Sequence, residues 1–321
     1  MVPEFMSQIS PDIMRGVSSL NLNISSPNCN REINALLQRT VLSGGKRIRP
    51  LLTFLMGEFF GLNVEKIRPF AQAVEMVHAA SLAHDDVIDN ATTRRGADSI
   101  NKVASNKYAV LAGDYLLSDV VFSVAAQGDV RLVQEISKVI QELSMGEWLQ
   151  LDASISRQYD RMLIEEIAKK KTSSVMCFCS IVAPVLTGCD EREIELARKF
   201  GESLGVAFQL IDDSLDFSKD SQKDAQLDLQ NGIVNAVLFE WLELHPQAKN
   251  SFLAGESLEH VFSVEGIEKA VKIVQDLALL KLDECRQILD KLSGGDNVTE
   301  KRKRAHQSLL GMINFLIART Y

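Results

Sequence analysis

Apolar side chains recur at three- and four-residue spacing along most of this chain. The spacing is clearest in residues 108–126, 131–151 and 162–186, where it predicts α-helices. No proline occurs between Pro69 and Pro184, so none of this long region is broken by that residue. We find no convincing alternation of apolar and polar residues of the kind that is typical of strands. The pattern therefore predicts an all-α fold.

Six short segments interrupt the helical pattern. They comprise residues 61–69, 126–130, 187–193, 218–232, 244–251 and 293–300. Each is short enough to connect two helices rather than two domains, and none separates regions of different composition. We therefore expect one domain over residues 6–321. The first five residues, MVPEF, are expected to be an expression scar outside that domain.

Composition and charge narrow the class of protein. Hydrophobic residues make up 46% of the 321 residues, which is enough for a sizeable core. The net charge of −8 argues against a nucleic-acid binder, because surfaces that follow phosphates carry a basic excess. Five scattered cysteines favour reduced thiols and a cytoplasmic protein. No apolar run reaches the length of a membrane span, so we expect no transmembrane segment.

Three aspartates directly follow a stretch that is apolar on nearly every face. Asp85, Asp86 and Asp89 come after residues 70–83, which predict a buried helix. Asp85 and Asp89 are four residues apart, so their like charges share a face and repel each other. Such a cluster needs a cationic partner, and carboxylate oxygens are ligands that suit Mg²⁺. The alternative is a solvated helix end without a metal.

The same spacing returns in Asp212, Asp213 and Asp216, again after an apolar helical stretch. Two acidic helix ends can face each other across a cavity and hold metal ions between them. Basic residues accompany both motifs: Lys46, Arg47 and Arg49 follow a glycine pair, and Arg94 and Arg95 follow the first aspartates. Metal on one side and guanidinium groups on the other suit a strongly anionic ligand, which we expect to be a diphosphate.

Five segments, in order along the chain, carry a resemblance to a known family. They are GGKRIRP at 44–50, HDDVIDNATTRRG at 84–96, VLAGDYLL at 110–117, KKKTS at 169–173 and FQLIDDSLDF at 208–217. The chain resembles the trans-isoprenyl diphosphate synthase, or polyprenyl synthetase, family. The resemblance implies antiparallel helices around a deep central cavity, a homodimer, and Mg²⁺-dependent head-to-tail condensation of isopentenyl diphosphate with an allylic diphosphate.

The resemblance also implies roles for single residues. Asp85, Asp89 and Asp212 would hold Mg²⁺, with three ions expected, and Asp86, Asp213 and Asp216 complete the two catalytic motifs. Arg94, Lys171 and Gln150 would bind the allylic diphosphate, while Lys46, Arg49, His78 and Arg95 would bind isopentenyl diphosphate. Thr172 and Gln209 would lie beside the allylic cation. The released diphosphate would accept the proton that the product loses after condensation.

The chain departs from the family pattern after the second aspartate motif. Ile233 and Asn235 replace the lysine and threonine of a Gly-Lys-x-Thr segment, although Lys223, Asp228 and Gly232 remain. Loss of that lysine removes one positive contact to the diphosphate. A low-activity or regulatory subunit of a heteromeric synthase therefore stays an alternative. A class I terpene cyclase is a second one, although such enzymes typically pair their aspartate motif with a different metal site.

Small residues precede the first aspartate motif, where the product would grow along the same helix. Ser81 and Ala80 lie four and five positions before Asp85, and neither is a bulky aromatic that would stop growth. Met76 and Val77 are the next residues expected to limit product length. We therefore expect a product of more than about twenty carbons, which could then enter a membrane.

Overall fold

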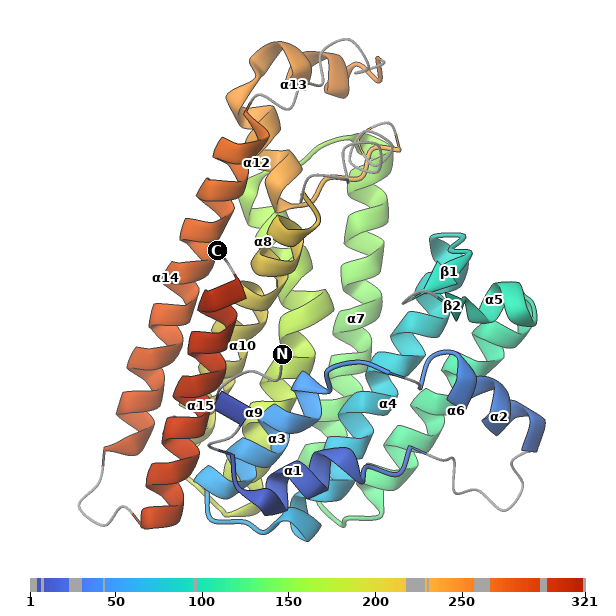
Figure 1. The fold of residues 1–321 in the computed structure, drawn as a ribbon. Coiled ribbons are helices and arrows are strands. Elements are labelled where there is room, and N and C mark those ends of the chain that lie inside the picture. Colours follow the sequence, from blue (N-terminus) through green and yellow to red (C-terminus); the bar gives the residue numbers. More distant parts are fainter. Residues whose placement is uncertain are drawn as a thin grey trace.

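The computed structural model of the chain describes residues 5–6, 9–22, 31–42, 44–94, 97–217, 229, 231–256, 266–294 and 299–319. Within these ranges the protein is a bundle of helices with a single two-residue β-ladder, Thr93–Arg94 against Ala97–Asp98 (Figure 1). The predicted all-α fold is confirmed.

The elements follow one another in a simple order. They are α1 (Pro11–Ser18), α2 (Arg31–Arg39), α3 (Ile48–Phe59), α4 (Val64–Ile88), β1 (Thr93–Arg94), β2 (Ala97–Asp98), α5 (Ile100–Val103), α6 (Asn106–Ala125), α7 (Val130–Ser156), α8 (Arg161–Ala168), the π-helix η2 (Lys169–Ser173), α9 (Ser174–Leu186), α10 (Glu191–Leu215), α12 (Ala236–Leu244), α13 (Pro246–Leu253), α14 (Ile267–Ser293) and α15 (Glu300–Arg319).

Two long helices, α4 and α10, form the centre of the bundle. Helix α4 packs against α3, α6 and α9, and α10 packs against α9, η2 and α14. Helix α4 is buried on most of its surface because apolar residues occupy nearly all of its faces. Both helices are 25 residues long, and the last aspartate of each motif, Asp89 or Asp216, follows directly as the C-cap residue. The architecture thus places both aspartate motifs at the carboxyl ends of core helices.

The predicted break at residues 61–69 is too long. Asn63 caps α4 by accepting a bond from the Lys66 backbone N–H, and the helix then continues through Pro69. Ile67 and Phe70 on either side of that proline are almost fully buried. Their packing therefore outweighs the backbone hydrogen bond that proline cannot make. In the same way, most of the expected break at 244–251 is helical, because α13 begins with Pro246 and continues to Leu253.

Phe5 belongs to the core, although the sequence assigned residues 1–5 to an expression scar. Its ring packs against Phe315 of α15 with 5.4 Å between ring centroids. A side chain on Gly311 would collide with Phe5, since an added Cβ would lie 2.8 Å from the Phe5 Cβ. Whatever its origin, this residue contributes to the packing of the C-terminal helix.

One helix bears on the expectation that the chain has no transmembrane segment. Helix α6 carries an 18-residue window with a mean hydropathy of 1.4 and so passes, by length and composition, as a possible membrane span. The charges at Asp114 and Asp119 obscure this run in the sequence. The indication is weak, because core helices of soluble proteins have the same length and composition.

Candidate active site

Within the described residues, three adjoining cavities surround the ends of α4 and α10. The α4–α7 cavity, of about 710 Å³, is lined by residues of α4, α6, α7 and η2. The α8–α10 cavity, of about 430 Å³, shares Asp85 and Lys171 with it. The α3 cavity, of about 500 Å³, contains the start of α3 and shares Arg49 and His78 with the α8–α10 cavity. The three cavities therefore adjoin one another through shared wall residues.

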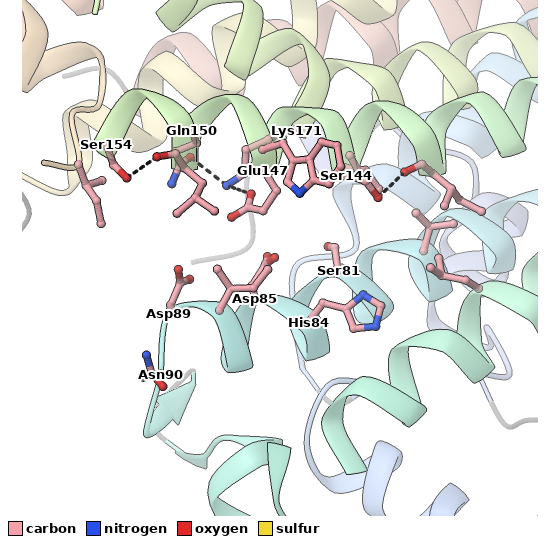
Figure 2. A pocket seen from close by; sticks show the side chains of 18 of the residues that line it. Ser81, His84, Asp85, Asp89, Asn90, Ser144, Glu147, Gln150, Ser154 and Lys171 are labelled. Carbon is pink, nitrogen blue, oxygen red and sulfur yellow. Dashed lines mark hydrogen bonds and ion pairs between the residues drawn. The ribbon is translucent and has the colours of Figure 1, made fainter. Parts of the chain in front are cut away.

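Asp85 and Asp89 face the α4–α7 cavity from the end of α4 (Figure 2). Burial raises the pKa of Asp85 to about 7, and the neighbouring Glu147 and Asp89 carboxylates add to the rise against the opposing effect of Lys171. Burial and Glu147 also raise the pKa of Asp89. The negative end of the α4 dipole lies in the same place. The nearby cations therefore do not fully compensate the negative charge of the ionised carboxylates.

Asp86, the middle residue of the motif, lies outside the described cavity walls. It is 0% exposed, and its Oδ1 accepts a bond of 2.6 Å from Arg94 Nε. Its Oδ2 accepts a 3.4 Å bond from the backbone N–H of Ile100. Successive helix residues point about 100° apart, so Asp86 cannot share the face of Asp85. The structure thus gives Asp86 the position of a residue that anchors Arg94 and the start of α5.

Asp213 repeats this arrangement in the second motif. Its Oδ1 accepts a 2.8 Å bond from Gln209 Nε2, and its Oδ2 accepts a 3.0 Å bond from the backbone N–H of Ala236. Thr172 Oγ1 in turn donates to Gln209 Oε1 at 2.6 Å. Burial raises the pKa of Asp213 to about 6. In both motifs the middle aspartate ties its helix to the following segment, although Asp213 also lines the α8–α10 cavity.

The outer two aspartates of the second motif line different cavities. Asp216 lines the α8–α10 cavity together with Asp85, and burial and Asp212 raise the pKa of Asp216. Asp212 lines the α3 cavity beside Lys46, Arg49 and His78. Asp213 and Asp216 therefore share a cavity with Asp85, whereas Asp212 lines the adjoining one.

The three consecutive lysines of η2 point to different partners. Lys169 Nζ lies 3.0 Å from Glu202 of α10, and Lys170 Nζ lies 2.6 Å from Glu142 of α7. Lys171 enters the α4–α7 cavity, where its ammonium contacts Glu147 and donates to Gln150 Oε1 at 3.0 Å (Figure 2). The structure thus brings together Lys171 and Gln150, as the resemblance implied.

Gly146 and Gly205 let η2 lie close to its neighbours. A Cβ on Gly146 of α7 would lie 2.7 Å from Lys171 Cγ, and a Cβ on Gly205 of α10 would lie 2.4 Å from Ser173 Cα. Single-turn π-helices occur frequently at functional sites. Here the two glycines place Lys171 and Thr172 at the walls of the site.

Glu147 is a site residue that sequence reasoning missed. It lines the α4–α7 cavity, contacts Lys171, and influences the pKa of both Asp85 and Asp89. A signal was present in the sequence, since Gly146 and Glu147 interrupt an otherwise apolar stretch three residues before Gln150. Only the folded structure shows that this glutamate opposes the aspartates of α4.

The α3 cavity gathers the basic residues around His78. Lys46 and Arg49 line it with His78, as the resemblance implied, and Phe208 and Asp212 complete the wall from α10. Arg47 has a left-handed backbone and donates from Nη1 to the Val17 carbonyl at 3.0 Å. That bond helps to fix the backbone conformation between Lys46 and Arg49. Arg95 lies outside the described residues.

Two of the four predicted chain-length residues line the α4–α7 cavity. Val77 and Ser81 do so because they are four residues apart and lie on the face that carries Asp85. Ala80 and Met76 are buried, but they line none of the three cavities. Sequence reasoning missed the opposite wall, which consists of Leu117 from α6 and Ile140, Leu143, Ser144 and Trp148 from α7.

The segment that departs from the family pattern borders the site. Ile233 lines the α4–α7 and α8–α10 cavities, so an apolar side chain stands where the resemblance implies a lysine. Asn235 caps α12 by accepting a bond from the Leu238 N–H, a role that threonine also performs. Gly232 has a positive φ of 77° and lies against the Ser154 carbonyl. Lys223 and Asp228 lie outside the described residues.

The carboxylates suit a hard divalent cation that also binds a substrate. Among the described residues no group of three acidic, histidine or cysteine side chains is close enough to hold a metal alone. Mg²⁺ usually binds through one or two carboxylates and completes its shell with substrate phosphates and water. Asp85 and Asp89, with their raised pKa values, offer such a pair.

Comparisons with known proteins agree with this geometry. The sequence model described as polyprenyl synthetase matches residues 30–274. The chain is 33% identical over 263 residues to solanesyl diphosphate synthase 3, chloroplastic/mitochondrial, of Arabidopsis thaliana, covering 78% of this chain and 61% of that protein. It is 40% identical over 175 residues to decaprenyl-diphosphate synthase of Dictyostelium discoideum, covering 54% and 38%. The chain thus spans less than two thirds of either relative.

A solved structure shares the fold. The crystal structure of a decaprenyl diphosphate synthase from Rhodobacter capsulatus superposes with a TM-score of 0.82 at 24% identity. The match covers 96% of both chains. The helical bundle is therefore the fold of that protein as well.

Proposed function

The chain belongs to the polyprenyl synthetase family, and from that premise we propose that it is a prenyltransferase. It condenses isopentenyl diphosphate head to tail with an allylic diphosphate and releases a trans-polyprenyl diphosphate. One observation carries the proposal: a cavity with paired carboxylates and a cavity with clustered basic residues both adjoin the α8–α10 cavity, which shares Asp85 and Lys171 with the first and Arg49 and His78 with the second. Such an arrangement suits two diphosphate substrates side by side.

The allylic diphosphate binds at the end of α4 in this proposal. Lys171 and Gln150 reach it from η2 and α7, and Arg94 reaches it from the segment that Asp86 anchors. Mg²⁺ held by Asp85 and Asp89, with further ions at the second motif, would supply Lewis-acid assistance to the departing diphosphate. The crowding that raises the pKa of Asp85 supports a divalent cation there.

Isopentenyl diphosphate binds in the α3 cavity, where Lys46, Arg49 and His78 hold its anionic end. The allylic carbon–oxygen bond breaks, and its electron pair leaves with the diphosphate. The double bond of isopentenyl diphosphate then forms a bond to the allylic carbon, and the released diphosphate takes the proton that restores the double bond. Thr172 and Gln209 line the α8–α10 cavity between the two diphosphate sites, and their side chains are hydrogen-bonded to each other. The dipoles of these side chains stabilise the positive charge that develops on the allylic carbon.

The growing chain extends along the α4–α7 cavity. Val77, Leu117, Ile140 and Leu143 give this cavity apolar walls, and Trp148 of α7 adds an aromatic side chain to its lining. The relatives named solanesyl and decaprenyl diphosphate synthases also support a long product. We therefore propose a product longer than C20.

We further propose a homodimer that joins through α6 and α7. Both helices carry large apolar side chains that are exposed in the single chain: Tyr108, Leu111, Phe122, Val130, Met145, Trp148, Leu151 and Ile155. Exposed apolar surface of this extent typically marks a protein–protein interface. It also explains why α6 has the composition of a membrane span while little of its apolar window is buried.

A cytoplasmic location is a further part of the proposal. The cysteines that the structure describes, Cys177, Cys179, Cys189 and Cys285, are free thiols. Free thiols of this kind are typical of a reducing compartment.

An assay of diphosphate release separates the proposed function from its alternatives. The full chain is incubated with Mg²⁺ and farnesyl diphosphate, with and without isopentenyl diphosphate. Condensation requires both substrates, whereas a terpene cyclase would release diphosphate from farnesyl diphosphate alone. A regulatory subunit would show neither reaction. Mass analysis of the products tests their length, and a sole product of about fifteen or twenty carbons would contradict the long-chain proposal.

A further inference from the structure

We propose that Glu147 is a positioning residue that holds the Lys171 ammonium against α7, away from Asp85 and Asp89, and so keeps these aspartates available to a divalent cation. The inference rests on the proposed function, because it assumes that the aspartates bind the metal. Glu147 is not part of either aspartate motif.

The contacts of Lys171 show how the ammonium is held. Its Nζ contacts Glu147 and donates to Gln150 Oε1 at 3.0 Å, and both partners come from α7. The Lys171 stem is fixed as well, since the lack of a side chain on Gly146 lets η2 lie against α7. Stem and ammonium are therefore both held on the α7 wall of the cavity.

Asp85 and Asp89 occupy the opposite wall (Figure 2). Lys171 makes no ion pair with either aspartate in the described structure, but it is close enough to lower the pKa of both. A lysine has a flexible four-carbon stem, so an ammonium that is not held can move toward the nearest carboxylates. The pair formed by Asp85 and Asp89 would then be partly neutralised by a side chain, and a metal ion would have to displace it.

The neighbouring lysine provides a comparison inside the same fold. Lys170 also reaches from η2 to a glutamate of α7, with 2.6 Å between its Nζ and Glu142 Oε2. Neither Lys170 nor Glu142 lines any of the three cavities. Glu142→Gln therefore removes a similar ion pair between the same two elements without changing the site.

The test measures metal binding rather than turnover. Mn²⁺ is titrated into the full chain without any diphosphate, and the free ion is counted by electron paramagnetic resonance. We expect Glu147→Gln to weaken Mn²⁺ binding about three- to tenfold, the size of a typical coupling between neighbouring groups. Glu142→Gln should stay within about twofold of the unaltered protein, and Glu147→Asp, which keeps the charge, should recover most of the loss. Circular dichroism checks that each variant is folded.

A double-mutant cycle with Lys171→Gln decides between positioning and direct ligation. If Glu147 positions the lysine, Lys171→Gln improves Mn²⁺ binding more in the Glu147→Gln protein than in the unaltered protein, because only there is the lysine free to compete. If Glu147 is instead a metal ligand, Lys171→Gln improves binding more in the unaltered protein, where it releases Glu147. That second result, or equal effects in both proteins, overturns the inference.

Asp85→Asn separates this inference from the proposed function. A large loss of Mn²⁺ binding in Asp85→Asn shows that the metal binds at the aspartates. If Lys171→Gln then fails to improve binding more in the Glu147→Gln protein, only the positioning role of Glu147 is contradicted, and the metal site is not. No change in Asp85→Asn overturns both the metal assignment and the inference.

Discussion

Asp86 and Arg94 form an ion pair in which the carboxylate is fully buried and the guanidinium is partly exposed, with 2.6 Å between Arg94 Nε and Asp86 Oδ1. The pair fixes the chain beyond α4, and with it the guanidinium that we place at the allylic diphosphate.

The first prediction concerns this pair. Asp86→Ala leaves Arg94 and the Ile100 N–H without their partner, so we expect the free energy of unfolding to fall by about 3 kcal/mol. Urea denaturation measures the change. Asp98→Asn, which alters an exposed pair with Lys102 nearby, should change stability by less than about 0.5 kcal/mol. Equal effects of the two substitutions would show that Asp86 is not an anchor.

The second prediction concerns the proposed metal site. Asp85→Ala and Asp212→Ala should each lower kcat by at least about 10³-fold, since removal of Lewis-acid assistance costs several kcal/mol of barrier. Neither variant should unfold, because each removes a partly exposed carboxylate that is crowded by others. Chelation of Mg²⁺ should abolish turnover of the unaltered protein. Near-normal turnover in either variant would contradict the assignment of that aspartate.

The third prediction concerns pH. The pKa of Asp85 in the folded, metal-free protein is about 7, above the ordinary value of 3.8, so the folded state binds more protons between these two values. The contribution of Asp85 to stability is therefore present at low pH and is lost as the pH rises through about 7. After allowance for partial exposure, we expect the free energy of unfolding to fall by on the order of 2 kcal/mol between pH 5 and pH 8.

Asp85→Asn provides the control for that pH dependence. Asparagine has the shape of aspartate but no charge, so the fall between pH 5 and pH 8 should become smaller. Asp276→Asn, at an exposed position on α14, should leave the dependence unchanged. Denaturation curves at four pH values would measure it. A slope in Asp85→Asn as steep as in the unaltered protein would assign the effect to another group.

The fourth prediction concerns product length. Ser81→Phe and Val77→Phe place an aromatic ring in the α4–α7 cavity at successive turns of α4, and both should shorten the product. Ser81 is nearer to Asp85, so its variant should give the shorter chains. Mass spectrometry of the products measures the distribution. Met76→Leu, at a buried position outside the cavity walls, should leave it unchanged, and shortening there would argue for a different path.

The fifth prediction concerns the oligomer. Phe122 is 74% exposed on α6, and a glutamate there would place a charge in the proposed interface. We expect Phe122→Glu to shift the protein from dimer to monomer in analytical ultracentrifugation. Leu280 is an apolar residue with 64% exposure on α14, away from α6 and α7, so Leu280→Glu should leave the dimer intact. A monomeric unaltered protein would refute the interface.

Local sequence patterns predicted the fold and many of the side chains that line the cavities, but not which neighbour each side chain meets. The apolar spacing predicts the helices, and two aspartate triplets predict a cation site. Glu147 could not be assigned, since its relation to Asp85 joins two helices that are 62 positions apart in the sequence. Such pairings arise from packing, here from the close approach that Gly146 permits.

Helical periodicity alone would have refined two assignments. Asp86 follows Asp85 by one position, and Ala80 precedes Ser81 by one, so each points about 100° away from its neighbour. Motif reasoning treats the residues of a motif as one group, whereas the helix divides them between the cavity and the core.

The π-helical turn at Lys169–Ser173 has a consequence for the way in which the chain can change. The Ser174 N–H bonds to the Lys169 carbonyl five residues earlier, so this turn holds one residue more than an α-helical turn would. Deleting any one of the three lysines would not simply remove a charge. Deleting Lys169 or Lys170 would return the turn to α-helical geometry and would change the direction in which Lys171 leaves the helix toward Gln150. Insertions and deletions should therefore be excluded from this short stretch, whereas single substitutions at Lys169 or Lys170 should be tolerated.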